Sequence, residues 1–262
     1  MIDSKQSSKT DSVASENARG KSLFVFSDAH LGANDPDTEK VKRAKALEMI
    51  SIVKERGYRL VILGDLFDFW FEYKHAIPKQ QLQIVFRLGD LVESGIPVDY
   101  VSGNHDFWLG DFLTDEVGIT IHREELILIE QGKKIFFIHG DGLAPQDWPY
   151  RILKRILRNR TNIRLYRLLP ADWGISLARW VSGSSRKHTS KRTDLGIHSF
   201  HGAYEDYART KLKEGYDAVL IGHLHTPLYH DWPEGIYINT GEFIRRFNYV
   251  EMKDGKLELK EL

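Results

Sequence analysis

Cysteine is absent from the 262 residues of this chain. Without thiols the protein has no disulfide framework, and zinc or iron–sulfur sites that depend on Cys are excluded. Any metal site must therefore be built from His, Asp, Asn or Glu side chains.

Long apolar runs are missing as well. No stretch approaches the roughly 20 apolar residues that a membrane-spanning helix needs. The first 20 residues are polar and lack the apolar core of a secretory signal. We interpret residues 1–20 as a disordered tail and residues 21–262 as the folded domain, and the default expectation is a cytoplasmic location.

Net charge is also zero, but the two signs are unevenly distributed. The chain has 37 basic and 37 acidic residues. Twelve of the basic residues and only two of the acidic ones lie between Pro145 and Arg192, which leaves 25 basic and 35 acidic residues elsewhere. A strongly basic segment in an acidic remainder predicts an anionic partner for that segment.

The apolar pattern predicts an α/β (α+β) fold. In the first half, strand patterns alternate with helical ones, which indicates βαβ units and a parallel sheet. The second half is richer in consecutive strands, so we expect two packed mixed sheets flanked by helices. Strands are expected at 23–26, 59–63, 97–101, 126–130, 134–138, 218–221, 236–239, 249–253 and 256–260, and helices at 37–56, 79–94 and 199–214.

Five of the expected strands are followed directly by residues of the metal-ligand type. Each block alone has an ordinary explanation, such as a turn, a helix cap or a structural histidine. Five blocks in register with strand ends instead predict one site, because ligands of open α/β sheets bind beyond the carboxyl ends of the strands. The blocks are Asp28-Ala29-His30, Gly64-Asp65, Gly103-Asn104-His105-Asp106, His139-Gly140-Asp141 and Gly222-His223-Leu224-His225.

The residue types in these blocks indicate a metal centre with mixed nitrogen and oxygen ligands. Such a set suits Mn²⁺, Fe²⁺ or Zn²⁺, and Mn²⁺ is favoured as oxygen ligands increase. Two ions bridged by a carboxylate can generate a nucleophile from water and stabilise the attacking and leaving oxygens of a displacement at phosphorus. We therefore expect two divalent metal ions, with Mn²⁺ as the first choice.

The ordered blocks D-x-H, G-D-x-x-D, G-N-H-D, H-G-D and G-H-x-H resemble the calcineurin-like metallophosphoesterase superfamily. This resemblance implies a four-layer fold and a dimetal site at the strand ends. It implies that Asp65 bridges the two metals and that His105 faces the scissile phosphate as a catalytic residue. Asp106 is expected to orient His105, Asp68 and Asp141 to support the ligands, and the glycine before Asn104 to permit the turn. The implied ligands are Asp28, His30, Asp65 and His225 for the first metal, and Asp65, Asn104, His139 and His223 for the second.

The basic segment is expected to form a helical cap over residues 145–195. Residues 150–158 (YRILKRILR) place Ile and Leu on one helical face and Arg and Lys on the other. A basic amphipathic helix suits an anionic membrane surface or an anionic lipid, and Trp148, Trp173 and Trp180 are rings of the interfacial type. The alternative is that these helices simply pack on the main domain with their charges in solvent.

A helical insertion between H-G-D and G-H-x-H resembles one branch of the superfamily, the UDP-2,3-diacylglucosamine hydrolases of lipid A biosynthesis. The segments SDAHLG, LGDLFDFW and HGDGL share this likeness. It implies a nucleotide-linked lipid substrate, cleaved at its α-phosphorus to UMP and 2,3-diacylglucosamine 1-phosphate. It also implies a peripheral position on the cytoplasmic face of the inner membrane. The residues expected to grip the glucosamine phosphate are Ser185, Arg186, Lys187, Lys191 and Arg192.

One departure from that branch keeps two alternatives open. Its best-described enzymes carry Arg where this chain has His105, the common residue of the superfamily. The first alternative is another phosphodiesterase that acts on nucleotides or nucleic acid. A nuclease should show a broad basic track, whereas here the cations are concentrated beside Leu, Ile and Trp, so nucleic acid is not expected. The second alternative, a non-catalytic scaffold, conflicts with the unbroken ligand set.

Overall fold

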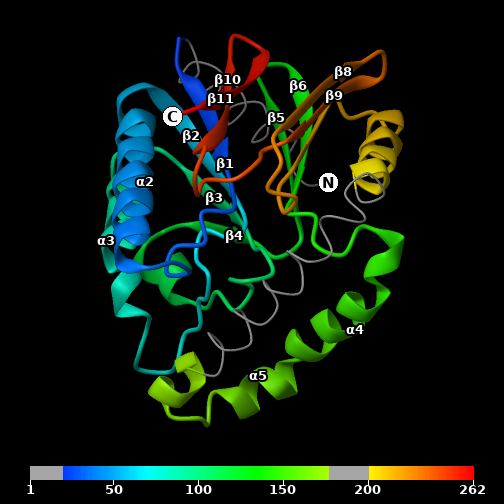
Figure 1. Ribbon diagram of the computed structural model, residues 1–262. Coiled ribbons are helices and arrows are strands. Elements are labelled where there is room, and N and C mark those ends of the chain that lie inside the picture. Colours follow the sequence, from blue (N-terminus) through cyan, green and yellow to red (C-terminus); the bar gives the residue numbers. More distant parts are fainter. Residues whose placement is uncertain (1–19, 177–200) are drawn as a thin grey trace, which may run out of the picture.

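Two β-sheets form the centre of the computed structural model, which describes residues 20–176 and 201–262 (Figure 1). The first sheet has six strands, and its strands β1 to β4 run parallel to one another. Their order is β11 (Lys256–Glu261), β10 (Asn248–Lys253), β1 (Ser22–Phe26), β2 (Gly57–Leu63), β3 (Val98–Val101) and β4 (Thr120–His122). The second sheet has the order β5 (Glu125–Glu130), β6 (Lys133–Ile138), β7 (Ala218–Ile221), β9 (Gly235–Asn239) and β8 (Leu228–Trp232).

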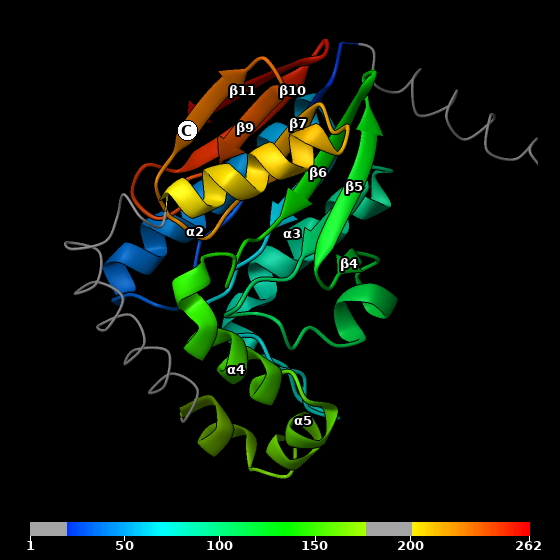
Figure 2. The ribbon, with the colours of Figure 1, turned by 90° about the vertical axis from the view of Figure 1, so that its right-hand side faces the viewer.

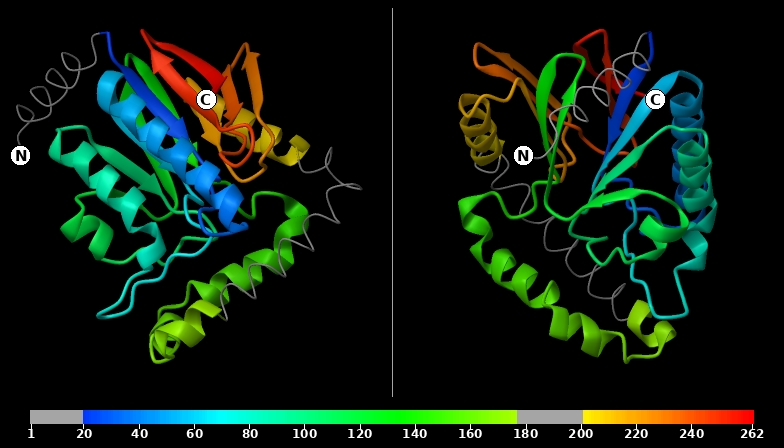
Figure 3. Two further views of the ribbon diagram at one scale, coloured as in Figure 1. Left: turned by 60° about the vertical axis from the view of Figure 1, so that its left-hand side comes forward. Right: turned by 180° about the vertical axis from the view of Figure 1, so that it is seen from behind.

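Helices cover the outer faces of both sheets, which completes four layers (Figures 2 and 3). Helix α2 (Pro36–Arg56) and helix α3 (Leu82–Glu93), which follows the short 3-10 turn η1 (Lys79–Gln81), pack on the first sheet. The helix over 201–213 packs on the second. This arrangement confirms the predicted fold class of two mixed sheets flanked by helices.

Alternation along the strands separates the core into layers. In β1, Leu23 and Val25 lie between the two sheets, whereas Phe24 and Phe26 face the helices of the first sheet. Successive side chains of a strand point to opposite faces, so a strand covered on both sides is apolar throughout. This explains why LFVF carries no polar residue until the chain leaves the sheet.

Helix α2 begins and ends where its sequence predicts. Asp35 caps it by accepting hydrogen bonds from the amides of Asp37 (3.1 Å) and Thr38 (3.0 Å), and Pro36 occupies the first turn. Its buried apolar face includes Ala46, Met49, Ile50 and Val53, as the spacing indicates. Gly57 ends the helix and is also the first residue of β2.

Three described elements were not expected from the pattern. They are β4, β8 and a π-helical turn, η2 (Phe112–Glu116). Strand β4 has only three residues, and β8 (LYHDW) has no fully buried position. Three residues are too few to show a pattern, and LYHDW has neither an apolar run nor a regular alternation of apolar and polar residues.

The described part of the basic segment lies at the carboxyl ends of the parallel strands (Figure 1). Its described part contains the turn η3 (Pro145–Asp147), helix α4 (Trp148–Leu157), helix α5 (Arg160–Tyr166) and a helical stretch at 171–176. The remainder of the predicted cap lies outside the described residues, as do its expected phosphate-gripping residues: Ser185, Arg186, Lys187, Lys191 and Arg192. Among the described residues, no helix is long and apolar enough to cross a membrane.

Candidate metal centre

Side chains from both sheets converge on one point beyond the strand ends. The Oδ1 atom of Asp28 lies 3.7 Å from His30 Nε2 and 3.4 Å from His225 Nε2. His30 Nε2 is also 3.6 Å from Asp65 Oδ2. Ligand atoms bound to one divalent ion at about 2.1 Å lie roughly 3 to 3.5 Å apart. The four residues expected to hold the first metal are therefore together, close to ligand spacing.

A second group meets at the same oxygen of Asp65. His139 Nε2 lies 3.4 Å from Asp65 Oδ2, 3.1 Å from Asn104 Oδ1 and 3.3 Å from His223 Nδ1. These are the four residues expected to hold the second metal. Asp65 Oδ2 lies in both groups, which is the position that a bridging carboxylate would occupy.

The carboxylates of Asp28 and Asp65 each accept a backbone hydrogen bond with one oxygen and direct the other oxygen into the centre. Asp28 Oδ2 accepts the amide of His223 (2.9 Å), and Asp65 Oδ1 accepts the amide of His105 (2.9 Å). Asp28 Oδ1 and Asp65 Oδ2 are buried and accept no hydrogen bond from the described part of the chain. A buried, unpaired carboxylate oxygen is costly unless a cation is near, so the donor set fits divalent ions at both points.

His139 is oriented by the first sheet. Its Nδ1 lies 2.9 Å from the carbonyl of Leu63, at the end of β2. A hydrogen bond from Nδ1–H to that carbonyl leaves Nε2 as the free nitrogen, which points to Asp65. Metal-binding histidines are commonly fixed in this way.

Five of the seven expected ligands have left-handed backbone conformations. The φ angles are +54° for Asp28, +42° for His30, +52° for Asp65, +68° for His223 and +55° for His225. Such conformations cost about 1 to 3 kcal/mol each in residues other than glycine and persist only where the surroundings enforce them. Here the loops brace one another, for example through His30 N–H donating to the Asp65 carbonyl (2.9 Å).

The glycine before Asn104 has a different role from the one we expected. Its φ is not left-handed, so the turn itself does not require it. A Cβ on Gly103 would instead overlap the carboxylate and amide of Asp65, and one on Gly64 would overlap the ring of His139. Both glycines provide the room that lets loops from neighbouring strands meet.

The electrostatics of the centre keep its carboxylates ionised. Burial would raise the pKa of Asp65, but His139 and His105 outweigh burial and hold that pKa below its usual range. Burial would lower the pKa of His139, but the carboxylates of Asp65 and Asp28 outweigh burial and raise it to about 10. Burial and His139 together lower the pKa of His223 to about 4. The centre is thus an anionic core surrounded by imidazoles.

His105 stands beside this core and is oriented by Asp68. Its Nδ1 lies 3.1 Å from the Asp68 carbonyl and 3.4 Å from Asp68 Oδ1, and its ring is perpendicular to that of His30 at 4.6 Å. Burial would lower the pKa of His105, but Asp65 and Asp68 outweigh it and raise it to about 9. His30, Asp68 and His105 could themselves group around a cation. However, His30 directs Nε2 to the core and only Nδ1 toward Asp68 (3.9 Å).

Asp106, expected to orient His105, directs its carboxylate elsewhere. It accepts hydrogen bonds from the amides of Gly103 (2.9 Å), Asp65 (3.3 Å) and Phe67 (3.3 Å) and from the hydroxyl of Tyr100. Asp106 therefore fastens the loop of Asn104 to the loop of Asp65. A carboxylate one residue after a histidine was a reasonable orienter in sequence, but the turn points the two side chains in different directions.

Asp141 anchors the cap helix. Its Oδ2 accepts from the Tyr150 hydroxyl (2.7 Å) and lies 2.8 Å from Lys154 Nζ and 3.4 Å from Arg158 Nη2. Arg158 also lies against the ring of Phe107 (3.8 Å to the ring centroid). These contacts tie α4 to the loops that carry His139 and His105, a role for Tyr150 and Arg158 that the sequence did not indicate.

The apolar face of α4 points away from this anchor. Because Lys154 and Arg158 turn inward to Asp141, Trp148 (61% exposed), Ile152 (50%) and Ile156 (52%) face outward. Farther along the insertion, Leu168 and Trp173 are 79% and 73% exposed. The described part of the insertion therefore presents apolar side chains outward, which is the reverse of an ordinary surface helix.

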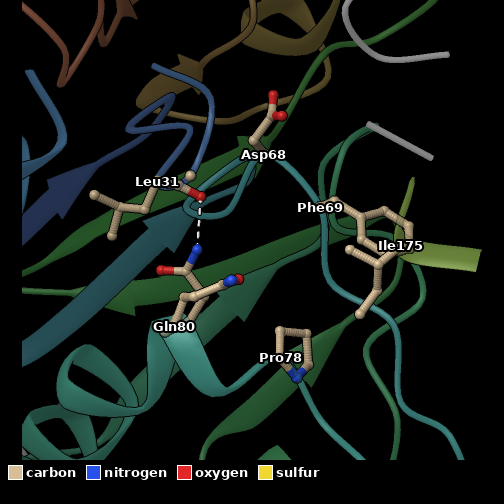
Figure 4. A pocket seen from close by; sticks show the side chains of 8 residues that line it. Leu31, Asp68, Phe69, Pro78, Gln80 and Ile175 are labelled. Atoms are coloured by element: carbon tan, nitrogen blue, oxygen red, sulfur yellow. Dashed lines mark hydrogen bonds between the residues drawn. The ribbon is translucent and has the colours of Figure 1, made fainter. Parts of the chain in front are cut away.

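A small pocket lies where the insertion meets the loop of Asp68 (Figure 4). Ile175 from the insertion faces Phe69, and Gln81 donates to the carbonyl of Leu31 at 2.9 Å on the other side. The insertion thus borders the centre on the Asp68 side as well as on the Asp141 side.

A four-layer α/β fold with His and Asp side chains that converge at its strand ends is the arrangement of a metal-dependent phosphoesterase. The chain belongs to the calcineurin-like phosphoesterase family, whose model matches residues 22–227. This membership implies divalent metal ions and makes the protein a hydrolase.

Two relatives carry the same name, "UDP-2,3-diacylglucosamine hydrolase". The protein of Porphyromonas gingivalis is 32% identical over 190 residues, covering 70% of this chain and 71% of its own. That of Nitrosococcus oceani is 29% identical over 207 residues, covering 79% and 80%. A solved archaeal phosphodiesterase aligns with 92% of this chain and 99% of its own at 13% identity and a TM-score of 0.47, too distant a likeness to say anything about function.

Proposed function

We propose that this protein hydrolyses the diphosphate of UDP-2,3-diacylglucosamine at its α-phosphorus, giving UMP and 2,3-diacylglucosamine 1-phosphate for lipid A biosynthesis. The observation that carries the substrate class is the placement of α4, which Asp141 holds beside the metal centre with its apolar side chains outward. The names of the relatives support the same substrate.

The residues that would hold two divalent ions are the two groups that share Asp65. Mn²⁺ is the first choice, with Fe²⁺ or Zn²⁺ as alternatives, because the donors mix imidazole, carboxylate and amide oxygen. When bound, such ions lower the pKa of water and neutralise charge on the phosphate.

His105 is proposed as the group that stabilises or protonates the leaving oxygen. Its ring lies next to His30 at the edge of the centre, and 14% of its side chain is exposed. Asp68 holds its Nδ1 through both the backbone carbonyl and the carboxylate, which fixes the orientation of the ring. The leaving oxygen belongs to the lipid 1-phosphate, so a proton there completes the cleavage.

The cap is proposed to provide lipid selectivity. Each buried CH₂ group of an acyl chain contributes about 0.8 kcal/mol, so acyl chains on the apolar side chains of the insertion can dominate affinity. Its cations suit an anionic headgroup and the cytoplasmic face of the inner membrane. Ser185, Arg186, Lys187, Lys191 and Arg192 stay our candidates for the glucosamine phosphate.

A second candidate is a phosphodiesterase for nucleotides, which His105 favours because it is the common residue of the superfamily at this position. Such an enzyme would use the same centre and would gain nothing from acyl chains. The two candidates therefore differ in one measurable quantity, the dependence of the rate on acylation.

Product analysis with Mn²⁺ in ¹⁸O-labelled water tests the proposal. We expect the label in UMP, because water attacks the α-phosphorus. We also expect kcat/KM to be at least about 10³ higher, or roughly 4 kcal/mol, for UDP-2,3-diacylglucosamine than for UDP-N-acetylglucosamine. Equal rates on the two UDP-sugars would reject the lipid substrate and favour the nucleotide phosphodiesterase.

A further inference from the structure

Lys42 is a lysine of α2 whose side chain is completely buried (0% exposed). Lysine is almost never fully buried unless its charge is paired. Its Nζ donates to the carbonyl of His30 (2.6 Å), to Asn34 Oδ1 (2.9 Å) and to Glu39 Oε1 (2.8 Å). Three acceptors match the three protons of the ammonium group.

These partners all belong to the connection between β1 and the first turns of α2. Glu39 completes the arrangement, because its carboxylate accepts the amides of Gly32 (2.7 Å) and Asn34 (2.9 Å). The Lys42–Glu39 ion pair therefore fastens residues 30–34 to the start of the helix. The charged groups of this pair thus hold the loop of residues 30–34 in place.

The loop carries His30, whose backbone is left-handed at φ +42°. The amide of His30 is held by the Asp65 carbonyl (2.9 Å), and its own carbonyl is held by Lys42. Fixing both ends of the residue keeps its strained conformation, which aims Nε2 at Asp28 and Asp65. Without Lys42 the carbonyl would lose its charged donor, and the strain would favour relaxation.

Packing of the helix on the sheet does not by itself require the Lys42–Glu39 ion pair. Replacing a buried ion pair by apolar residues of similar volume is often neutral or stabilising. Helix α2 already buries Ala46, Met49 and Val53 against the first sheet. Two apolar side chains in place of Lys42 and Glu39 would serve the helix equally well, whereas the hydrogen bonds of this pair go to the loop.

We propose that Lys42 is a positioning residue for the metal position formed by Asp28, His30 and His225. This inference rests on the proposed dimetal site. The hydrogen bonds of Lys42 go to the connection that carries His30, whereas Asn104, His139 and His223 lie on loops of other strands. Loss of Lys42 should therefore weaken one metal position and spare the other.

Titration of the metal-free full chain with Mn²⁺, by calorimetry and electron paramagnetic resonance, tests this. The wild type should bind two ions and show the spectrum of a coupled pair. Lys42→Met keeps the length of the side chain and removes the donor. We expect it to bind one ion as the wild type does, to bind the other about 10–100-fold more weakly, and to show isolated Mn²⁺ at low loading. Asp65→Ala, which removes the shared carboxylate, is the reference for a defect at both positions.

Val53→Ala is the matched control. It creates a cavity under the same helix and lowers stability, and we expect it to keep both ions. The inference is overturned if Lys42→Met binds two ions with wild-type affinity, or if Val53→Ala loses the same ion. If Lys42→Met does not fold, Glu39→Gln carries the test with the same expectation. A wild type that binds fewer than two ions would overturn the dimetal site itself, which separates the two failures.

Discussion

At the residue scale, the surroundings of a side chain decide its chemistry more than its type does. His30 and His105 lie ring to ring at 4.6 Å, yet His30 directs Nε2 to Asp28 and Asp65 while His105 is held by Asp68. Burial lowers the pKa of His30, whereas the carboxylates near His105 overcome burial and raise its pKa. One imidazole is therefore suited to a metal ion and the other to a negatively charged oxygen.

Replacing His105 by alanine should separate these two roles. We expect His105→Ala to retain both metal ions and to lose about 10²- to 10⁴-fold in kcat, because a positioned proton donor contributes that much to a rate. Metal content and single-turnover rates on the same sample measure the two quantities. Loss of an ion in this variant would make His105 a ligand, and a wild-type rate would remove it from the mechanism.

At the element scale, α4 is an amphipathic helix whose polar face meets the protein and whose apolar face is exposed. Two residues of α4, Tyr150 and Lys154, and the residue just after it, Arg158, contact one buried carboxylate, that of Asp141. They are spaced four apart. This spacing places them on one face of a helix. The apolar side chains are left exposed on the other face, where the lipid substrate that we propose would meet them.

Weakening the anchor should affect the lipid substrate selectively. The double variant Tyr150→Phe, Lys154→Met removes two of the donors to Asp141. We expect it to lower kcat/KM for UDP-2,3-diacylglucosamine by about 10-fold or more, because each lost hydrogen bond to a charged group is worth about 1.5 to 3 kcal/mol of positioning. Hydrolysis of bis-p-nitrophenyl phosphate should change by less than about 2-fold. As a control, Arg87→Met at an exposed position of α3 should alter neither rate. Parallel losses on both substrates in the double variant would contradict the role of α4.

At the scale of the whole molecule, the centre joins the two sheets. Asp28, Asp65 and Asn104 follow strands of the first sheet, and His139 and His223 follow strands of the second. Their loops are already connected, since the amide of His223 donates to Asp28 and the ring of His139 to the Leu63 carbonyl. A cation held by both sets of residues would add a further connection between the sheets.

Removing metal should therefore lower the stability of the entire fold. A ligand at 100 times its Kd stabilises the folded state by about 2.7 kcal/mol per site. A chain of this size gains roughly 2 to 4 °C in Tm per kcal/mol. We expect chelation to lower Tm by about 5 to 10 °C per lost ion and Mn²⁺ to restore it, as measured by calorimetry. A Tm that does not respond to chelation would show that the sheets do not depend on the ions.

The amino-acid sequence by itself determined most of the strands, the layers and which residues meet at the centre. Apolar runs such as LFVF and AVLI are covered on both faces, so their pattern is local and readable, and each ends at a ligand-type block. Strand β4 was not predicted because three residues are too few to show a pattern, and β8 (LYHDW) was not predicted because it has neither an apolar run nor a regular alternation. Asp28 and His223 are 195 residues apart and follow strands of different sheets, so their meeting depends on how the two sheets pack.

Only the tertiary structure decided where individual side chains point. Asp106 fastens a loop, Asp141 anchors α4, and Lys42 reaches the carbonyl of His30. The sequence also did not show which face of α4 packs on the protein, because periodicity defines the two faces of a helix and not their surroundings. These outcomes depend on turns and on contacts between distant segments, and no local pattern of residues encodes them.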